Sequence, residues 1–250
     1  MHLLDPLALL IFPSACEVCG VTLRPAGTLW GLPRHVCPPC LASCLERAGA
    51  PAWSLDGLPG RSLFWHEGRE AAWVRAIKQG GREGFLAELA RLWPLPPIPT
   101  EAGTLLIPVP ADRLRRRERG GDHVERLACG WALAWGLDCA RLLERRGGAK
   151  QQGLDAGGRR RNLESQYRTG PRAAVQRGRS AVLVDDVVTT GATLELCRRR
   201  LETAGLRVRG ALTLVCAPSP ELRLSGLEGL VAWLPGREAS EVLDAWPGQS

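Results

Sequence analysis

One stretch constrains this chain more than any other, because it joins an apolar strand, two acids, a threonine-rich turn and a helix start. Residues 181–194 have the sequence Ala-Val-Leu-Val-Asp-Asp-Val-Val-Thr-Thr-Gly-Ala-Thr-Leu. The apolar run 181–184 predicts a buried strand that stops at the acids, and residues 193–204 predict a helix that ends at Gly205. Open α/β sheets bind ligands at the carboxyl ends of their strands, so the sequence predicts a ligand site here.

The residue types in this stretch indicate which ligand it would suit. Turn 189–193 offers hydroxyls, backbone N–H groups and a glycine, and the next helix adds the positive end of its dipole, which favours a phosphate. The acids would repel a phosphate but can accept hydrogen bonds from two sugar hydroxyls. No Gly-Lys-Ser/Thr follows, so this is not a Walker A loop. The alternative is an ordinary strand–turn–helix with Asp and Thr as capping residues. The predicted ligand-binding residues are Asp185, Asp186, Val187, Thr189, Thr190, Gly191, Ala192 and Thr193.

Strand and helix patterns alternate around this stretch. Residues 105–109 and 208–215 predict strands, and residues 124–137 predict a helix. Such alternation implies parallel crossovers and a doubly wound α/β sheet. We expect four segments: a cysteine-rich module at 1–49, a Pro/Gly-rich linker and helical segment at 50–99, an α/β domain at 100–218 and a tail of unknown role at 219–250.

Two Cys-x-x-Cys pairs predict a small zinc ribbon ahead of the α/β domain. Their thiols belong to Cys16, Cys19, Cys37 and Cys40. Each pair can present two thiolates to one tetrahedral Zn²⁺, and four thiolates leave no open position, so the ion would be structural. Two disulfides and metal-free redox dithiols are the alternatives. Cys44 lies close enough in sequence to compete as a ligand.

Composition adds weaker constraints. A hydrophobic content of 45% and a charged content of 24% fit a globular protein with a core, and the net charge of +7 suggests anionic ligands or partners. Cys129, Cys139, Cys197 and Cys216 are scattered through apolar patterns, which is typical of small core residues. We therefore expect a reduced, cytoplasmic protein, and no apolar run is long enough for a transmembrane segment.

The central stretch resembles the diagnostic motif of type I phosphoribosyltransferases. In these enzymes the two acids hold the ribose 2′- and 3′-hydroxyls, and the threonine-rich turn holds the 5′-phosphate. The resemblance implies phosphoribosyl pyrophosphate as the ligand, with Mg²⁺ bridging the pyrophosphate and the ribose hydroxyls. It also implies the fold of that class, a Rossmann-like parallel sheet with flanking helices, here preceded by the zinc ribbon.

The chain as a whole, from about residue 10 to 217, resembles the ComF family of competence-associated proteins. Ile-Lys-Gln-Gly at 77–80 is similar to the family's helix end, and Pro-Val-Pro at 108–110 to its strand end. The resemblance implies a pyrophosphate loop that includes Val109, Pro110 and Arg119. It implies a flexible hood that includes Gln151, Arg159 and Asn162. Where the family has Phe-Asn-Gln after Arg-Gly, this chain has Gly121, Asp122 and His123.

Two functions follow from this resemblance. The first is a phosphoribosyltransferase with an unknown acceptor, acting in DNA uptake during natural transformation with the uptake machinery. Thr189 occupies the position where purine-salvage relatives often place a carboxylate base, which argues against that substrate class. The second is a non-catalytic module that binds the phosphoribosyl ligand or single-stranded DNA. A dense arginine run at 113–119 would serve either function, or it is a solvated loop.

Overall fold

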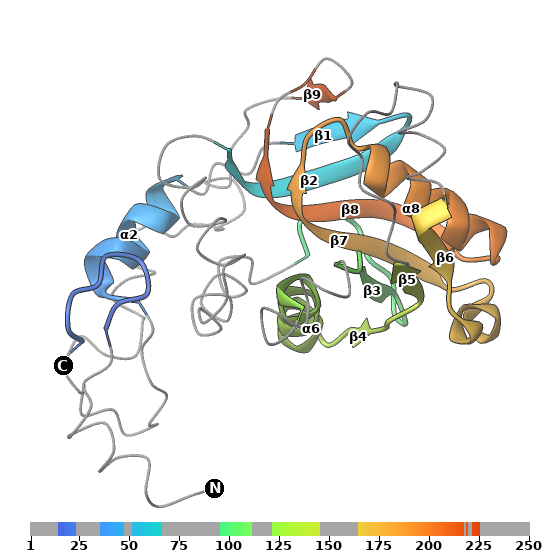
Figure 1. Cartoon of the computed structure of the whole chain (residues 1–250), viewed down its shortest axis with the longest axis horizontal. Helices are drawn as coiled ribbons and strands as arrows, with labels where there is room; N and C mark the ends of the chain where they lie inside the picture. Colours follow the sequence, from blue (N-terminus) through green and yellow to red (C-terminus); the bar gives the residue numbers. More distant parts are fainter. Residues whose placement is uncertain are drawn as a thin grey trace, which may run out of the picture.

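The computed structural model describes residues 15–23, 36–47, 52–66, 96–111, 122–145, 165–217, 219 and 222–225. These residues form a seven-stranded sheet in the order β4-β3-β7-β8-β2-β1-β9 and a separate two-stranded sheet, β5-β6 (Figure 1). The strands are β1 (Ala52–Leu55), β2 (Leu58–Trp65), β3 (Leu105–Pro108), β4 (Asp138–Cys139), β5 (Leu143–Arg145), β6 (Tyr167–Thr169), β7 (Ser180–Val188), β8 (Arg207–Cys216) and β9 (Arg223–Ser225). The helices are α2 (Pro38–Arg47), α6 (His123–Trp135), the 3-10 helix η1 (Pro171–Gln176) and α8 (Ala192–Thr203).

The large sheet is mostly parallel. Strands β4, β3, β7, β8 and β2 run parallel to one another, whereas β1 pairs antiparallel with both β2 and β9 at one edge. Helix α6 follows β3 and precedes β4, while α8 joins β7 to β8. The predicted α/β architecture is therefore confirmed.

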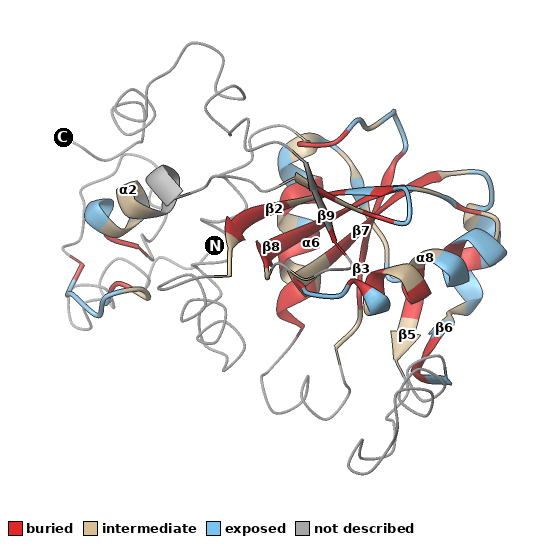
Figure 2. Cartoon of the chain, turned by 90° about the horizontal axis from the view of Figure 1, so that it is seen from above, coloured by how far each residue is buried: buried red, intermediate tan, exposed pale blue. Residues whose placement is uncertain are grey.

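The two helices cover opposite faces of the sheet. Apolar side chains of α6, including Leu127 and Trp131, pack with Val182 and Val184 of β7 in one cluster of buried residues. Apolar side chains of α8, including Leu194, share the other cluster with Leu183 of β7. Alternate residues of β7 thus serve alternate faces, as the pleat requires. Figure 2 shows the resulting core as buried central strands, with exposed residues on the outer side of α8.

The Pro/Gly-rich segment that was expected to be a linker is instead a β-hairpin. Residues 52–65 form β1 and β2 in antiparallel register, and β2 also pairs with β8 inside the main sheet. Asp56 and Gly57 connect the strands with φ values of 45° and 78°. An Asp-Gly turn with two positive φ angles matches the right-handed twist of a hairpin, so the linker interpretation of these residues is wrong. At the same edge, β9 from the start of the tail pairs with β1.

Strand β7 also differs from the prediction, because it does not stop at the acids. It runs on to Val188, with Asp185 opposite Thr213 and Val188 opposite Cys216 of β8. Val187 and Val188 are apolar β-branched residues that favour the continued strand. The acids therefore lie inside the last half of the strand, and the turn begins only at Thr189.

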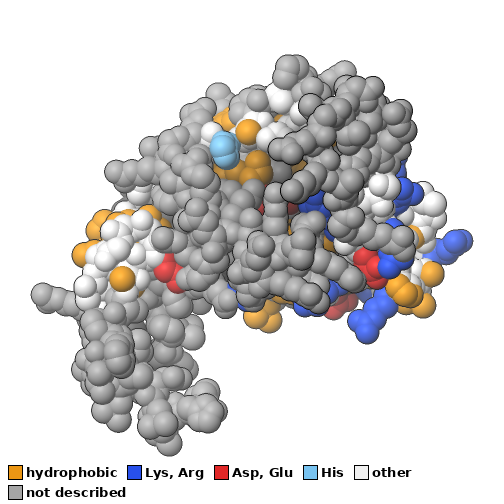
Figure 3. Space-filling view, in the orientation of Figure 1, with side chains coloured by type: hydrophobic (Ala, Val, Ile, Leu, Met, Phe, Trp, Pro, Cys, Tyr) orange, Lys and Arg blue, Asp and Glu red, His pale blue; other side chains and the backbone are white. Residues whose placement is uncertain are grey.

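The amino-terminal edge of the sheet carries many of the described basic residues, seen at the right of Figure 3 with acidic side chains between them. Arg179 donates to Asp138 at 2.7 Å, and Arg207 lies 3.3 Å from Glu101. These arginines are thus paired with acids at the edge opposite the predicted ligand site. Within the described ranges, no helix combines the length and apolarity that crossing a bilayer requires.

Candidate functional site

The predicted ligand residues lie where the winding of the sheet reverses. The chain leaves β3 through α6 toward β4 on one side, and it leaves β7 through α8 toward β8 on the other. Because β3 and β7 are neighbours and their helices lie on opposite faces, their carboxyl ends form a switch point, the place where open α/β sheets bind ligands. Strand β3 ends at Pro108, opposite Val184, so Asp185 and the residues after it border the space beyond β3.

The two acids of β7 point to opposite faces of the sheet. Asp186 lies on the α6 side, where one of its carboxylate oxygens is 2.7 Å from Nε2 of His123. Asp185 lies on the α8 side, accepts a hydrogen bond from the Asp186 backbone N–H at 2.8 Å, and has a charge that acts on Cys197 of α8. Both carboxylates are half-buried. They therefore lie on the two faces of β7 rather than as a parallel pair.

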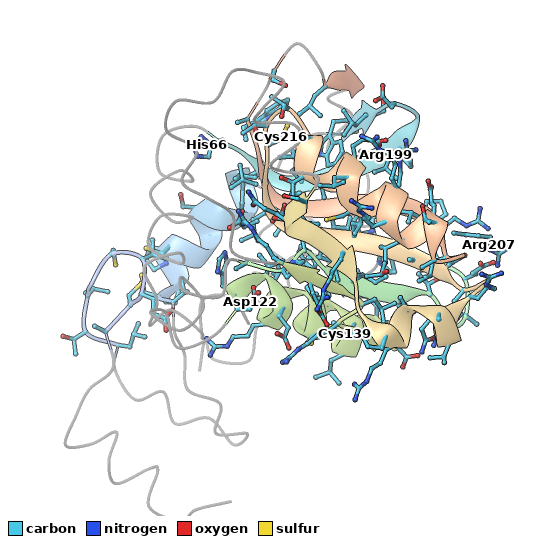
Figure 4. All side chains as sticks on the ribbon, turned by 45° about the vertical axis from the view of Figure 1, so that its right-hand side comes forward. His66, Asp122, Cys139, Arg199, Arg207 and Cys216 are labelled. Carbon is cyan, nitrogen blue, oxygen red and sulfur yellow. The ribbon has the colours of Figure 1, made fainter. Side chains whose placement is uncertain are left out.

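The start of α6 contacts the candidate site through Asp186. Asp122 caps the helix by accepting from the backbone N–H groups of Val124 and Glu125 at 3.1 and 3.4 Å. Its other oxygen accepts from the N–H of Ala111 at 3.0 Å. Figure 4 shows Asp122 at this end of α6. His123 follows and is buried against Asp186. Sequence reasoning noticed both residues only as departures from the ComF pattern and assigned them no role.

The turn after β7 presents the other predicted groups. Thr189, Thr190 and Ala192 are exposed, and Thr193 is half-buried. Gly191 is the N-cap residue of α8 with φ 73° and ψ 0° and has no side chain to cap the helix, while the Thr190 hydroxyl accepts from the Ala192 N–H at 3.4 Å. The turn thus places hydroxyls beside the N-terminal turn of a twelve-residue helix. Such an arrangement suits an anion.

Gly191 is required by two independent constraints. Its positive φ is disfavoured for any residue with a Cβ. A Cβ on Gly191 would also lie 2.3 Å from Cδ2 of Leu55, which is buried on β1. The hairpin that the sequence analysis missed therefore supports the turn from beneath.

The remaining predicted residues fall on or beside segments outside the described ranges. Val109 is buried at the end of β3, its N–H donates to the carbonyl of Val184 at 2.8 Å, and Pro110 follows it. Arg119, Gln151, Arg159 and Asn162 lie outside the described residues. The ends of the segment that contains Arg119 meet at the site, since Ala111 donates to Asp122.

Tyr167 is a buried aromatic residue whose pKa is affected by the charge of Asp185. Burial raises the pKa of Tyr167, the nearby Arg145 lowers it, and the charges of Asp185 and Asp186 raise it. Arg145 stacks over the Tyr167 ring at 5.3 Å and donates to Gln166 at 3.0 Å. Tyr167 begins β6 and Arg145 ends β5, and these two residues are paired, so the segment with the expected hood residues leaves and returns at adjacent positions.

The four cysteines predicted to bind zinc come together. The Sγ atoms of Cys16, Cys19, Cys37 and Cys40 all lie within 4.8 Å of one another. The Sγ atoms of Cys19 and Cys37 are 3.7 Å apart, close to the ~3.8 Å edge of a tetrahedron with Zn–S bonds of about 2.3 Å. The cluster is thus compatible with a structural zinc site. The side chain of Cys44 lies outside the described residues.

Backbone groups favour an ionised thiol in this cluster. Burial raises the pKa of Cys16, but hydrogen bonds from backbone N–H groups lower it by more, so that the pKa falls to about 7. One of these donors is the Cys37 N–H, whose nitrogen is 3.3 Å from the Sγ of Cys16. Burial raises the pKa of Cys40, and the thiols of Cys37 and Cys19 raise it again. Four thiolates this close repel one another unless a cation lies between them, and the donor set is the one that Zn²⁺ prefers.

Fold and site together define an α/β protein with a cysteine cluster and a strand–turn–helix site at a switch point. The chain is 32% identical over 197 residues to DNA utilization protein YhgH of Escherichia coli O157:H7, an alignment that spans 72% of this chain and 80% of the relative. This chain therefore belongs to the family of DNA utilization protein YhgH. No family model matches the chain.

Three solved structures show weak likeness. The chain aligns with the allosteric regulatory enzyme of purine biosynthesis at a TM-score of 0.33 and 14% identity, over 86% of this chain and 38% of that enzyme. It aligns with adenine phosphoribosyltransferase from Leishmania tarentolae at a TM-score of 0.32 and 16% identity, over 70% of this chain and 87% of that enzyme. It aligns with adenine phosphoribosyltransferase from Leishmania donovani at a TM-score of 0.30 and 14% identity, over 82% of this chain and 91% of that enzyme. With TM-scores below 0.5, these likenesses carry no further conclusion.

Proposed function

We propose that this chain is a phosphoribosyltransferase-type protein of the ComF family that binds phosphoribosyl pyrophosphate with Mg²⁺ beside β7. The observation that carries the proposal is the position of residues 185–193 at the switch point, with two carboxylates next to a hydroxyl-lined turn and a helix start. A sugar phosphate needs acceptors for its hydroxyls and donors for its phosphate, and this stretch offers both in order.

The opposite directions of the two acids make a specific demand on the ligand. The ribose would lie against the part of β7 that extends past the end of β3. One ribose hydroxyl would then reach Asp185 and the neighbouring hydroxyl would reach Asp186. His123 would fix the carboxylate of Asp186, and Thr189, Thr190 and the first turn of α8 would hold the 5′-phosphate. Mg²⁺ would supply charge neutralisation for the pyrophosphate.

Transfer to an acceptor would be a substitution at ribose C1. A ring nitrogen of a nucleobase acceptor would form a bond to C1 and lose its proton. The C1–O bond to pyrophosphate would break, with its electron pair leaving on pyrophosphate. Stabilising charge and holding the two reactants in position would supply most of the catalysis, so no nucleophilic side chain is required. The name of the relative, DNA utilization protein, supports a role in handling DNA, and we place DNA uptake in this proposal.

The test is calorimetric titration of the full-length, zinc-loaded chain with phosphoribosyl pyrophosphate and Mg²⁺. We expect micromolar-range binding. A hydrogen bond to a charged group contributes about 1.5–3 kcal/mol, so Asp185→Asn with Asp186→Asn should weaken binding about 10²-fold or more. A pyrophosphate-release assay with nucleobase acceptors then tests turnover.

Asp138→Asn is the matched control. It removes one carboxylate from the start of β4, at the opposite edge of the sheet, where Asp138 pairs with Arg179. Its affinity should equal that of the parent chain. Equal affinity in the parent and in the folded double variant at residues 185 and 186 would refute the proposed site.

A further inference from the structure

Two cysteines outside the zinc cluster lie against each other at the surface. Cys129 is on α6 and exposed, whereas Cys139 is on β4 and half-buried. Their Sγ atoms are 2.7 Å apart. Figure 4 labels Cys139 on the short edge strand beside α6. The sequence analysis expected core cysteines at all four scattered positions. It is correct for Cys197 and Cys216, which are fully buried, and wrong for Cys129.

We propose that Cys129 and Cys139 form a redox-active dithiol, which an organic disulfide of the glutathione class oxidises to an intramolecular disulfide. A disulfide bond is about 2.05 Å long, so the sulfur atoms need to approach by only about 0.6–0.7 Å. The two residues lie on neighbouring elements, α6 and β4, that are joined by a tight turn at Gly136. This inference is independent of the ligand proposed for β7.

The exposure of the two thiols gives each a different part in the reaction. The thiolate of exposed Cys129 attacks one sulfur of the small disulfide, forming a mixed disulfide and releasing one small thiol. Cys139 then loses its proton and attacks the Sγ of Cys129, which releases the second small thiol. Two protein thiols and one small disulfide thus become one protein disulfide and two small thiols, and the electrons balance.

The surroundings fit this order of events. Burial raises the pKa of Cys139, Cys129 and the charge of Glu125 raise it further, and the charge of Arg141 lowers it. Cys139 is therefore a protonated thiol until the mixed disulfide turns the neighbouring Cys129 sulfur into an electrophile. Arg141 is exposed and paired with Glu125, one turn before Cys129 on α6. Its charge also favours the Cys139 thiolate that the second step requires.

The chain permits a sharp test, because trypsin cleaves after Arg126 and Arg141 and both cysteines then lie in the peptide 127–141. Full-length, zinc-loaded protein is incubated with oxidised glutathione, alkylated in denaturant and digested with trypsin. The peptide masses are then measured by mass spectrometry. We expect peptide 127–141 to be unalkylated and two hydrogen atoms lighter than its dithiol form. Treatment with dithiothreitol before alkylation should make the same peptide doubly alkylated.

The variant Cys139→Ser separates the two steps. It should stop at the mixed disulfide, so that peptide 127–141 carries one glutathione on Cys129. Peptides that contain the buried Cys197 and Cys216 are internal controls and should be alkylated under all conditions. A doubly alkylated parent peptide after incubation with oxidised glutathione would overturn the proposal. A parent peptide that keeps glutathione on Cys129 would overturn it as well, because Cys139 would not have resolved the adduct.

Discussion

Replacement of Gly191 by alanine tests how the turn after β7 is held. The left-handed conformation costs a residue with a Cβ about 1–2 kcal/mol, and Gly191 has φ 73°. The new Cβ would also meet the buried side chain of Leu55 at 2.3 Å, and overpacking costs about 1–3 kcal/mol. Alanine restricts the unfolded chain, which returns about 0.4–1 kcal/mol. We therefore expect Gly191→Ala to lower the free energy of unfolding by about 1–4.6 kcal/mol.

The assay is urea denaturation of the zinc-loaded chain followed by circular dichroism. Gly136→Ala is the matched control, because Gly136 has φ 64° and no atom within 4 Å of a built Cβ. It should show the conformational cost alone, and Gly191→Ala should exceed it by about 1–3 kcal/mol. In a Leu55→Ala background that excess should disappear. Equal losses at the two glycines, or an excess that persists without Leu55, would refute the contact between the hairpin and the turn.

Two further predictions concern the cysteines. The purified chain should bind one Zn²⁺, and the variant Cys37→Ser should lose it, whereas the control Asp138→Asn should keep it. Native mass spectrometry measures the zinc content, and an unchanged content in Cys37→Ser would contradict the cluster. Burial raises the pKa of Cys216 from 9.0 to about 11. Because the folded state disfavours its thiolate, Cys216 contributes stability that is complete below pH 9 and lost as the pH rises toward 11. Urea midpoints should fall over that range more steeply in the parent than in Cys216→Ala, and parallel curves would contradict this.

The parts of the fold that could be predicted from the sequence are those with local, uninterrupted patterns. The apolar run of β8 and the amphipathic pattern of α6 predict these elements to within about two residues of their bounds, and the apolar run of β7 predicts where that strand starts. The cysteine spacing predicted the cluster, because paired Cys-x-x-Cys segments have few other ways to satisfy their thiols.

The hairpin β1–β2 was missed for a physical reason. Its strands contain Pro59 and Gly60, which weaken a strand pattern, and Gly60 is needed because Trp53 packs against its backbone, 2.2 Å from a built Cβ. Trp53 in turn donates to Ser62 at 2.9 Å inside the sheet. These requirements arise only when the strands pair, and the composition of the segment alone indicated a linker. The Asp56-Gly57 turn is typical of a hairpin and was the local signal for the correct structure.

The role of the α6 start depends on contacts between residues that are distant in sequence. Asp122 uses one oxygen for the N–H groups of Val124 and Glu125 and the other for Ala111. An asparagine has one acceptor oxygen, so its amide N–H₂ would face one of these donors and leave it without a partner. Aspartate thus ties the end of β3 to α6. With α6 fixed in this way, Nε2 of His123 lies 2.7 Å from Asp186, so a side chain from the start of α6 contacts one acid of the candidate site.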